Sequence, residues 1–396
     1  MTKLIKFPHI NQLRNVVETV RGRAAYHTVT LPKLIFHGTV KLHGTNSSVC
    51  RDMSTGETWC QSRETIITPE TDNAGFARFC AENVEAINTL FSAYECGSGV
   101  MSIYGEWCGK GIMKGVGINN IEKMFVVFGV KITFEIKYLP WVDIEITKPQ
   151  IGQKIVGRTI DFNTWEESWG EISDEPLGAM THWITPEFIE DAVWLQTSFT
   201  KILDPLLVTT LNTKRIFDIE EFPTFDVTVD FNDADKSVDE LVKLTDRVET
   251  QCPVALAFGA IGIGEGLAWK CIQKWYSDKG EIKTSDLRFK TKGLKHKESA
   301  NDKPSADPIK VASIQKFVDE VATVHRFEKM LEKLEIAGVV IKMENTGQFL
   351  KLIGEDIMRE EGDVLTVSGL DRKDVMSSVN NAAKRWWISI INSRPL

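Results

Sequence analysis

Short stretches of alternating apolar and polar residues fill much of the first three quarters of the chain. Such alternation is typical of strands with one buried face. It predicts strands over residues 36–42, 47–50, 59–62, 102–107 and 124–132, with one long helical pattern among them, over 76–91. Because these strands outnumber the helices and do not alternate with them, we predict an α+β fold with antiparallel sheets.

Helical spacing of apolar residues marks the two ends of the chain. Residues 10–20 predict a short amphipathic helix before the first strand, residues 309–336 predict a helix, and Asp371 and Asp374 open another. The polar stretch 298–308 has the composition of a linker. We therefore predict a first domain over 1–297, a linker over 298–308 and a small all-helical domain over 309–396.

The overall composition is that of an ordinary globular protein. The chain has 396 residues and 42% hydrophobic residues, and no apolar run approaches the roughly 18 residues of a membrane span. Its seven cysteines form no C-x-x-C pair, which favours a reducing compartment over a disulfide framework or structural zinc. We expect a cytoplasmic monomer with no membrane association.

Charge is distributed unevenly along the chain, whose net charge is −8. Residues 279–297 carry six lysines and one arginine against two acids, whereas residues 161–191 carry nine acids and neither lysine nor arginine. Phosphate contacts depend on clustered Lys and Arg and not on the net charge. A polyanion is expected to meet the first segment and to avoid the second.

The stretch from Lys41 to Asn46 reads Lys-Leu-His-Gly-Thr-Asn and follows a predicted strand. A lysine at a strand end can act as an amine nucleophile, and a nearby glycine such as Gly44 lets the backbone approach a phosphate closely. The ordinary pKa of a lysine, about 10.4, leaves the amine protonated and inert. We therefore expect burial or neighbouring positive charge to favour its neutral form.

Further segments follow in a fixed order: Gln61-Ser62-Arg63-Glu64, Ile103-Tyr104-Gly105-Glu106-Trp107, Phe128 within a strand, Gly264-Glu265-Gly266-Leu267-Ala268-Trp269-Lys270, and Phe289-Lys290-Thr291-Lys292. With the Lys41 segment, this series resembles the covalent nucleotidyltransferases, and most of all the ATP-dependent RNA ligase 2 family. The resemblance spans roughly residues 30 to 297. It implies that residues 1–297 form an antiparallel-sheet nucleotidyltransferase (ATP-grasp-like ligase) domain that carries out adenylyl transfer.

The resemblance also implies roles for individual residues. Lys41 would be the nucleophile that accepts AMP, and Lys290 and Lys292 would hold the α-phosphate. Around the nucleotide, Glu106 would bind the ribose, Phe128 would stack on the adenine, Arg63 would contact the ribose or a nucleic-acid phosphate, and Lys270 would contact the triphosphate. Glu265 would bind the metal, Mg²⁺ or Mn²⁺. Carboxylates suit hydroxyls and Mg²⁺, and an aromatic face suits a base.

Two features depart from the family pattern. Val40 stands where many relatives have an acid, which leaves the preference for ATP over GTP open. The separation of Glu106 and Glu265 is longer than the resemblance leads us to expect, so we interpret residues 133–200, which are acidic and rich in tryptophan, as an insertion. That insertion is expected to have a small core of its own, and an interaction surface for a protein partner is the alternative.

The expected activity is that of an ATP-dependent RNA ligase that joins a 3′-hydroxyl to a 5′-phosphate through lysyl-AMP and RNA-adenylate intermediates. A DNA ligase, a GTP-using mRNA capping enzyme and an inactive nucleic-acid-binding relative are the alternatives. The DNA ligases and capping enzymes carry a β-barrel after the paired lysines, whereas helical periodicity follows them here. The partner would be RNA, either a nicked duplex or broken ends, in a role such as RNA repair.

Overall fold

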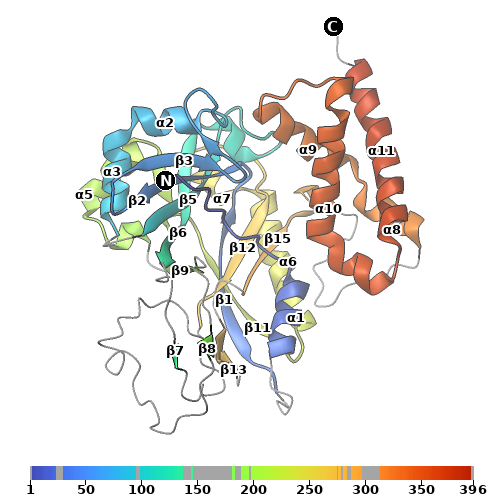
Figure 1. The fold of residues 1–396 in the computed structure, drawn as a ribbon, viewed down its shortest axis with the longest axis horizontal. Helices are drawn as coiled ribbons and strands as arrows, with labels where there is room; N and C mark the ends of the chain where they lie inside the picture. The colour runs from blue at the N-terminus through green and yellow to red at the C-terminus, as the bar shows by residue number, and fades with distance from the viewer. Residues whose placement is uncertain are drawn as a thin grey trace.

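Two sheets with flanking helices form the larger part of the protein, and a bundle of helices packs beside them (Figure 1). The structure, a computed structural model, describes residues 2–23, 30–94, 99–136, 144–145, 181–182, 189–195, 198–273, 275–277, 280–282, 287–296 and 313–393. None of the helices in these ranges is long and apolar enough to cross a membrane. The predicted linker and most of the predicted insertion lie outside the described residues.

The first sheet has four strands, each antiparallel to its neighbours, in the order β11 (Phe225–Asp230), β1 (Lys33–Lys41), β12 (Gly266–Cys271) and β15 (Arg288–Lys292). Strand β1 alternates strictly, with Leu34, Phe36 and Val40 buried in the core. Burial of each such side chain contributes about 1.5–3 kcal/mol and fixes which face of the strand points inward. Lys41 consequently points away from the core, on the opposite face.

The second sheet has seven strands, and six of them follow one another in the order β10 (Ile216–Asp218), β6 (Met124–Ile136), β5 (Val100–Cys108), β2 (Thr45–Asp52), β3 (Thr58–Ser62) and β4 (Ile66–Ile67). The seventh, β9 (Ile189–Leu195), also pairs with β6. Only β10 with β6 is a parallel pair among these described strands. The short pairs β7 (Ile144–Glu145) with β8 (Thr181–His182) and β13 (Trp275–Ser277) with β14 (Gly280–Ile282) complete the described strands.

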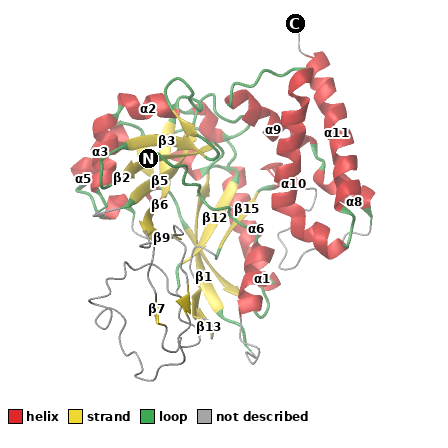
Figure 2. Ribbon diagram, in the orientation of Figure 1, coloured by secondary structure: helices red, strands yellow, loops and turns green. Residues whose placement is uncertain are grey.

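Helices cover both sheets (Figure 2). Their bounds are α1 (Leu13–Arg23), α2 (Phe76–Glu82), α3 (Val84–Ser92), α5 (Pro205–Thr213), α6 (Asp235–Thr250) and α7 (Pro253–Ala257). One hydrophobic core joins α1 and α6 to the first sheet, and a second joins α2 and α3 to the second sheet. In α1, Leu13, Val16, Val17 and Val20 are all buried, as the spacing of a helix with one apolar face requires.

The C-terminal helical bundle, residues 313–393, consists of α8 (Ile314–Val321), α9 (Val324–Ile336), α10 (Thr346–Ser368) and α11 (Arg372–Ser393). It has a hydrophobic core of its own, in which the rings of Phe349 and Trp387 stack with centroids 4.5 Å apart. The described residues of this bundle contain no strand. The α+β class with largely antiparallel sheets and the helical C-terminal region are thus confirmed.

Several predicted boundaries were wrong. The N-terminal helix begins at Leu13 and not at Ile10. The pattern over 76–91 is two helices that break at Asn83, and the pattern over 309–336 is two helices separated by Ala322 and Thr323. The ends of the predicted insertion, residues 133–136 and 189–195, belong to strands β6 and β9 of the second sheet.

Buried polar contacts fasten the helical bundle to the N-terminal helix. The guanidinium of Arg14 in α1 donates to the Asp363 carboxylate at 2.5 and 3.0 Å, to Glu361 at 3.1 Å and to the backbone carbonyl of Glu360 at 2.7 Å. The Asn15 side chain also donates to Asp363, at 3.0 Å. We call these residues of α1 and α10 the Arg14 network. It fixes α10 at the edge of the first sheet, next to β15.

Candidate active site

The predicted nucleophile and one predicted phosphate-binding lysine lie on one face of the first sheet. In the strand register Lys41 is opposite Gly266, and Gly266 is opposite Lys292. Directly paired residues of neighbouring strands point to the same face of a sheet. Lys41 and Lys292 therefore lie on the same side of the sheet, one on each side of Gly266, and Glu265 contacts both. Lys290, two residues earlier in β15, points to the same side.

Gly266 cannot be replaced without strain. Its φ is +151°, and a Cβ atom there would lie 2.1 Å from the carbonyl oxygen of Thr291. The glycine therefore allows the backbone of β12 to pack closely against that of β15.

The Glu265 carboxylate contacts several basic side chains of this site. Its buried carboxylate accepts a hydrogen bond from the Lys41 ammonium at 2.6 Å, lies 3.2 Å from Nδ1 of His43, and forms an ion pair with Lys292 at 3.4 Å. Burial raises the pKa of Glu265, but the charges of Lys41, Lys292 and His43 outweigh burial and hold the pKa well below its usual range. Glu265 is therefore an ionised carboxylate in direct contact with the predicted nucleophile.

Glu106 lies at the other side of Lys41. Its carboxylate accepts a hydrogen bond from the backbone N–H of Gly44 at 2.9 Å, which ties the turn after Lys41 to strand β5. Burial raises the pKa of Glu106 to about 7, although the positive charge of Lys41 acts in the opposite direction. A Cβ at Gly44 would lie 2.5 Å from the carbonyl oxygen of Trp107, so this close approach requires glycine.

Lys290 has a partner from the C-terminal helical bundle that the sequence did not predict. Its ammonium donates to the Glu360 carboxylate in α10 at 2.7 Å, and His9 lies 3.8 Å from the same carboxylate. Burial lowers the pKa of Lys290 to about 8, against the opposing effect of Glu360. Glu360 of the bundle thus accepts a hydrogen bond from Lys290, a lysine that we expected to bind a phosphate.

The predicted adenine-stacking residue, Phe128, lies on β6 and is partly buried. Phe7 packs edge-on against it, with ring centroids 5.1 Å apart. Arg63 follows β3, where burial and the neighbouring charge of Arg359 lower its pKa. The N-terminal segment that carries Phe7 and His9 therefore contacts residues of the candidate site and its surroundings, which no sequence motif indicated.

The structure does not bring Lys270 to this group. It lies on the same face of β12 as Gly266 but four residues further along the strand, roughly 13 Å away at 3.3 Å per residue. Its ammonium forms an ion pair with Glu220 at 3.0 Å, and Glu220 also contacts His37, the residue opposite Lys270 in β1. A contact between Lys270 and a triphosphate stays a prediction.

The side chains around Glu265 supply only part of the ligands that a divalent metal needs. No group of three or more His, Cys, Asp or Glu side chains arranged to hold a metal occurs in the described part of the chain. Mg²⁺ is commonly bound through one or two carboxylates, with water and substrate phosphates completing the shell. Glu265 is a carboxylate of this kind, so a metal here would depend on a phosphate ligand for its remaining contacts.

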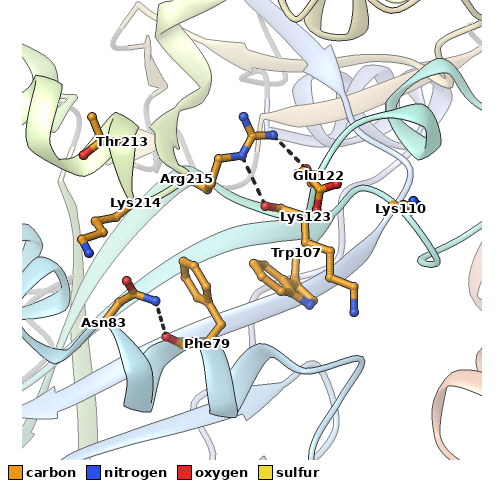
Figure 3. A pocket seen from close by; sticks show the side chains of 9 residues that line it. All are labelled: Phe79, Asn83, Trp107, Lys110, Glu122, Lys123, Thr213, Lys214 and Arg215. Atoms are coloured by element: carbon orange, nitrogen blue, oxygen red, sulfur yellow. Dashed lines mark hydrogen bonds between the residues drawn. The ribbon is translucent and has the colours of Figure 1, made fainter.

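A separate pocket of about 560 Å³ lies on the other side of strand β5 (Figure 3). Trp107 lines this pocket, whereas the preceding residue, Glu106, accepts from the Gly44 N–H on the other side, because neighbouring residues of a strand face opposite ways. Arg215 closes one side by donating from Nη2 to the carbonyl of Glu122 at 2.8 Å. None of the predicted site residues lines this pocket.

Comparison with known proteins identifies the segment that carries the first half of this site. Residues 35–176 match the family model described as RNA ligase. This match bears out the resemblance to RNA ligases over that segment. No curated protein matches the chain.

Solved structures with some likeness include RNA ligase variants from Naegleria gruberi. One with ATP and manganese has a TM-score of 0.36 and 12% identity, and covers 74% of this chain and 57% of that chain. Another, with AMP and manganese, has a TM-score of 0.35 with the same identity and coverage. A structure of the same ligase with pyrophosphate also has a TM-score of 0.35 at 12% identity. This chain therefore spans little more than half the length of these neighbours.

Proposed function

We propose that this protein, whose residues 35–176 match the RNA ligase family, is an ATP-dependent RNA ligase that joins a 3′-hydroxyl to a 5′-phosphate through covalent lysyl-AMP. The observation that carries the proposal is the row of Lys41, Gly266 and Lys292, with the Lys41 amine held 2.6 Å from Glu265. A lysine, a facing cation and a buried carboxylate are what transfer of an adenylyl group to an amine requires.

In the first step the Lys41 amine attacks the α-phosphorus of ATP, and a nitrogen–phosphorus bond forms as the bond to pyrophosphate breaks. The amine must first lose a proton. The Glu265 carboxylate, which accepts a hydrogen bond from this amine at 2.6 Å, would receive the proton. A bound divalent metal would supply neutralisation of the phosphate charge.

The next two steps transfer the adenylyl group and join the ends. An oxygen of the RNA 5′-phosphate attacks the same phosphorus, and Lys41 leaves as an amine that takes up a proton. The 3′-hydroxyl then attacks the activated 5′-phosphate and AMP departs. Lys290 and Lys292, on the cleft side of β15, would hold the charged oxygens throughout.

The helical C-terminal bundle favours this function over its closest alternatives. DNA ligases and capping enzymes place a β-barrel after the paired lysines, whereas residues 313–393 contain only helices and turns. We also propose that the two predicted domains have different roles. Residues 1–297 would carry out adenylyl transfer, and the helices over 309–396 would position the RNA.

Incubation of the protein with magnesium and ATP or GTP labelled at the α-phosphate tests the proposal. ATP should label the wild-type chain covalently, and Lys41→Ala should lose the label. Lys33→Ala is the matched control, because Lys33 lies on the same strand and has a side chain that is 68% exposed and pairs with Asp230. Labelling by GTP alone would favour the capping alternative, and equal labelling of Lys41→Ala would refute the proposal.

A further inference from the structure

The pocket of about 560 Å³ beside Trp107 takes no part in the proposed chemistry (Figure 3). Its volume lies in the range of small-molecule and cofactor sites, roughly 300–1,000 Å³. Separate parts of the chain build it: helix α2, the end of strand β5, the segment before β6, and the end of α5. The pocket is therefore a product of the whole fold and is large enough for a ligand.

The lining of this pocket is strongly basic. Glu122 is the one acid among its described residues, whereas the basic residues are Lys110, Lys123, Lys214 and Arg215. The lining thus has an excess of positive charge, although the whole chain has a net charge of −8. Clustered Lys and Arg side chains in a hollow attract anions, and phosphate groups in particular. An anion is therefore the expected occupant.

Two of these basic side chains are held in place by backbone carbonyls. The Lys123 ammonium donates to the carbonyl of Ala74 at 2.7 Å, and the Arg215 guanidinium donates to that of Glu122 at 2.8 Å. A carbonyl carries no net charge, so these bonds position both side chains and leave their positive charge in place. Each group has further N–H donors, since an ammonium has three and a guanidinium five. Both side chains can therefore still bind an anion.

Aromatic rings lie between the basic side chains. The rings of Phe79 and Trp107 have centroids 4.7 Å apart. Trp107 is 3% exposed and its indole N–H donates to the Ala74 carbonyl at 3.0 Å, so it is a fixed support for the half-buried Phe79. In Figure 3 Lys214 lies at one end of the pocket and Lys110 at the other, with both rings between them. An aromatic ring with a cation on each side matches a base with a phosphate on each side, which is the repeating pattern of a nucleic-acid strand.

We propose that this pocket binds one nucleotide of a single-stranded RNA segment, with the base against Phe79 and the neighbouring phosphates near Lys214 at one end and Lys110 at the other. This inference rests on the proposed function, which supplies RNA as the ligand. A free nucleotide such as AMP has the same base but a single phosphate, so it would contact the basic side chains at one end only.

The pocket lies on the opposite face of β5 from the candidate active site. Trp107 lines the pocket, and the preceding residue, Glu106, accepts a hydrogen bond from the Gly44 N–H in the turn after Lys41. RNA in the pocket would therefore be bound at a part of the strand remote from the ends that are joined. A remote contact of this kind contributes to the affinity for RNA and not to the rate of adenylyl transfer to Lys41.

Binding of a fluorescently labelled single-stranded RNA, about ten nucleotides long, to the full-length protein tests the proposal, with anisotropy followed over a range of salt concentrations. The first variant combines Lys110→Met with Lys214→Met. Both positions are exposed, so the fold should persist. The affinity for RNA should fall about tenfold. The slope of log K against log salt should become shallower by about 1.4, because each phosphate contact of a single strand contributes about 0.7.

The second variant, Phe79→Leu, keeps an apolar side chain and removes the aromatic face. It should also weaken RNA binding about tenfold through the loss of stacking, and it should leave the salt slope unchanged because no charge is lost. Lys33→Met with Lys236→Met is the matched control. These two lysines are 68% and 79% exposed and lie outside the pocket, and their replacement removes the same amount of charge. The control should keep the affinity for RNA within about twofold of the wild type.

A second arm measures AMP binding and the formation of lysyl-AMP from ATP in the same variants, and both should stay within about twofold of the wild type. Weaker AMP binding with unchanged RNA binding would assign the pocket to a free nucleotide and overturn the assignment to RNA. Unchanged RNA binding in both pocket variants, or an equal loss in the control, would overturn it as well. RNA binding needs no covalent adduct. Failure of the proposed function, seen as absent lysyl-AMP in the wild type, is therefore distinguishable from failure of this pocket.

Discussion

Gly266 controls the site at the scale of one residue, because only glycine lets β12, the strand between those of Lys41 and Lys292, pack this closely against β15. We expect Gly266→Ala to lower the free energy of unfolding by about 3 kcal/mol, since a methyl group would meet the Thr291 carbonyl at 2.1 Å and φ is +151°. Denaturant unfolding measures this change. Gly22→Ala is the control, because nothing lies within 4 Å of its added Cβ, and it should be neutral or slightly stabilising. An equal effect of both variants would contradict the prediction.

The Glu106 carboxyl should make stability depend on pH. Its pKa is raised to about 7 in the folded protein, mainly by burial, from 4.5 as the ordinary value. Between these values the folded state binds more protons than the unfolded state, so stability falls as pH rises from about 4.5 to 7. The contribution to the slope is at most about 1.4 kcal/mol per pH unit.

Glu106→Gln keeps an acceptor for the Gly44 N–H and removes the titration. The wild type should lose stability relative to this variant as pH rises through that window. Unfolding measured at several pH values gives the difference, and parallel curves for the two proteins would refute the assignment.

The lysines and carboxylates of the candidate site could be predicted from the sequence, whereas their partners from the bundle could not. The motif segments carry Lys41, Glu265 and Lys292, and strand alternation alone predicts which of their neighbours are buried. Glu360 is 70 residues from Lys290 and belongs to no motif. Only the folded arrangement of α10 beside β15 brings the two together, so no local pattern could indicate the pair.

At the scale of elements, the errors of prediction have local causes. Neither Asn83 nor Ala322 with Thr323 contains the glycine or proline that usually marks a helix end. Thr323 instead starts α9 by accepting a hydrogen bond from the Arg326 N–H at 3.2 Å. Helix α10 lies in the region predicted to be helical but was not predicted as a separate element. Its buried face includes the charged residues Asp356, Glu360 and Glu361, which hide the apolar periodicity on which the prediction depended.

The contact between α1 and α10 should be a major source of stability. Arg14 is 12% exposed at its side chain, and its loss leaves the carboxylates of Glu361 and Asp363 without their main cation. We expect Arg14→Ala to cost about 3–5 kcal/mol, as breaking a buried pair from one side does. Denaturant unfolding provides the measurement. Arg21→Ala, an exposed arginine of the same helix, should change stability by less than about 1 kcal/mol.

At the scale of the whole molecule, the two parts should unfold together. Each has a hydrophobic core of its own, so independent unfolding is available in principle. The Arg14 network and the Lys290–Glu360 pair couple the two parts, because separating the parts would leave buried charges without their partners. We expect one calorimetric transition in the wild type and two in Arg14→Ala combined with Glu360→Ala. Two transitions already in the wild type would contradict this coupling.

The Arg14 network also has a consequence for biosynthesis. Arg14 and Asp363 are 349 positions apart, so a ribosome working at about 5–20 residues per second needs on the order of 20 to 70 seconds to deliver the second after the first. During that interval Arg14 in α1 has been synthesised, but its acidic partners Glu361 and Asp363 have not. The contact between α1 and α10 therefore forms late in synthesis, and a chain released before α10 is made keeps β1, β12 and β15 but lacks the acids that pair with Arg14.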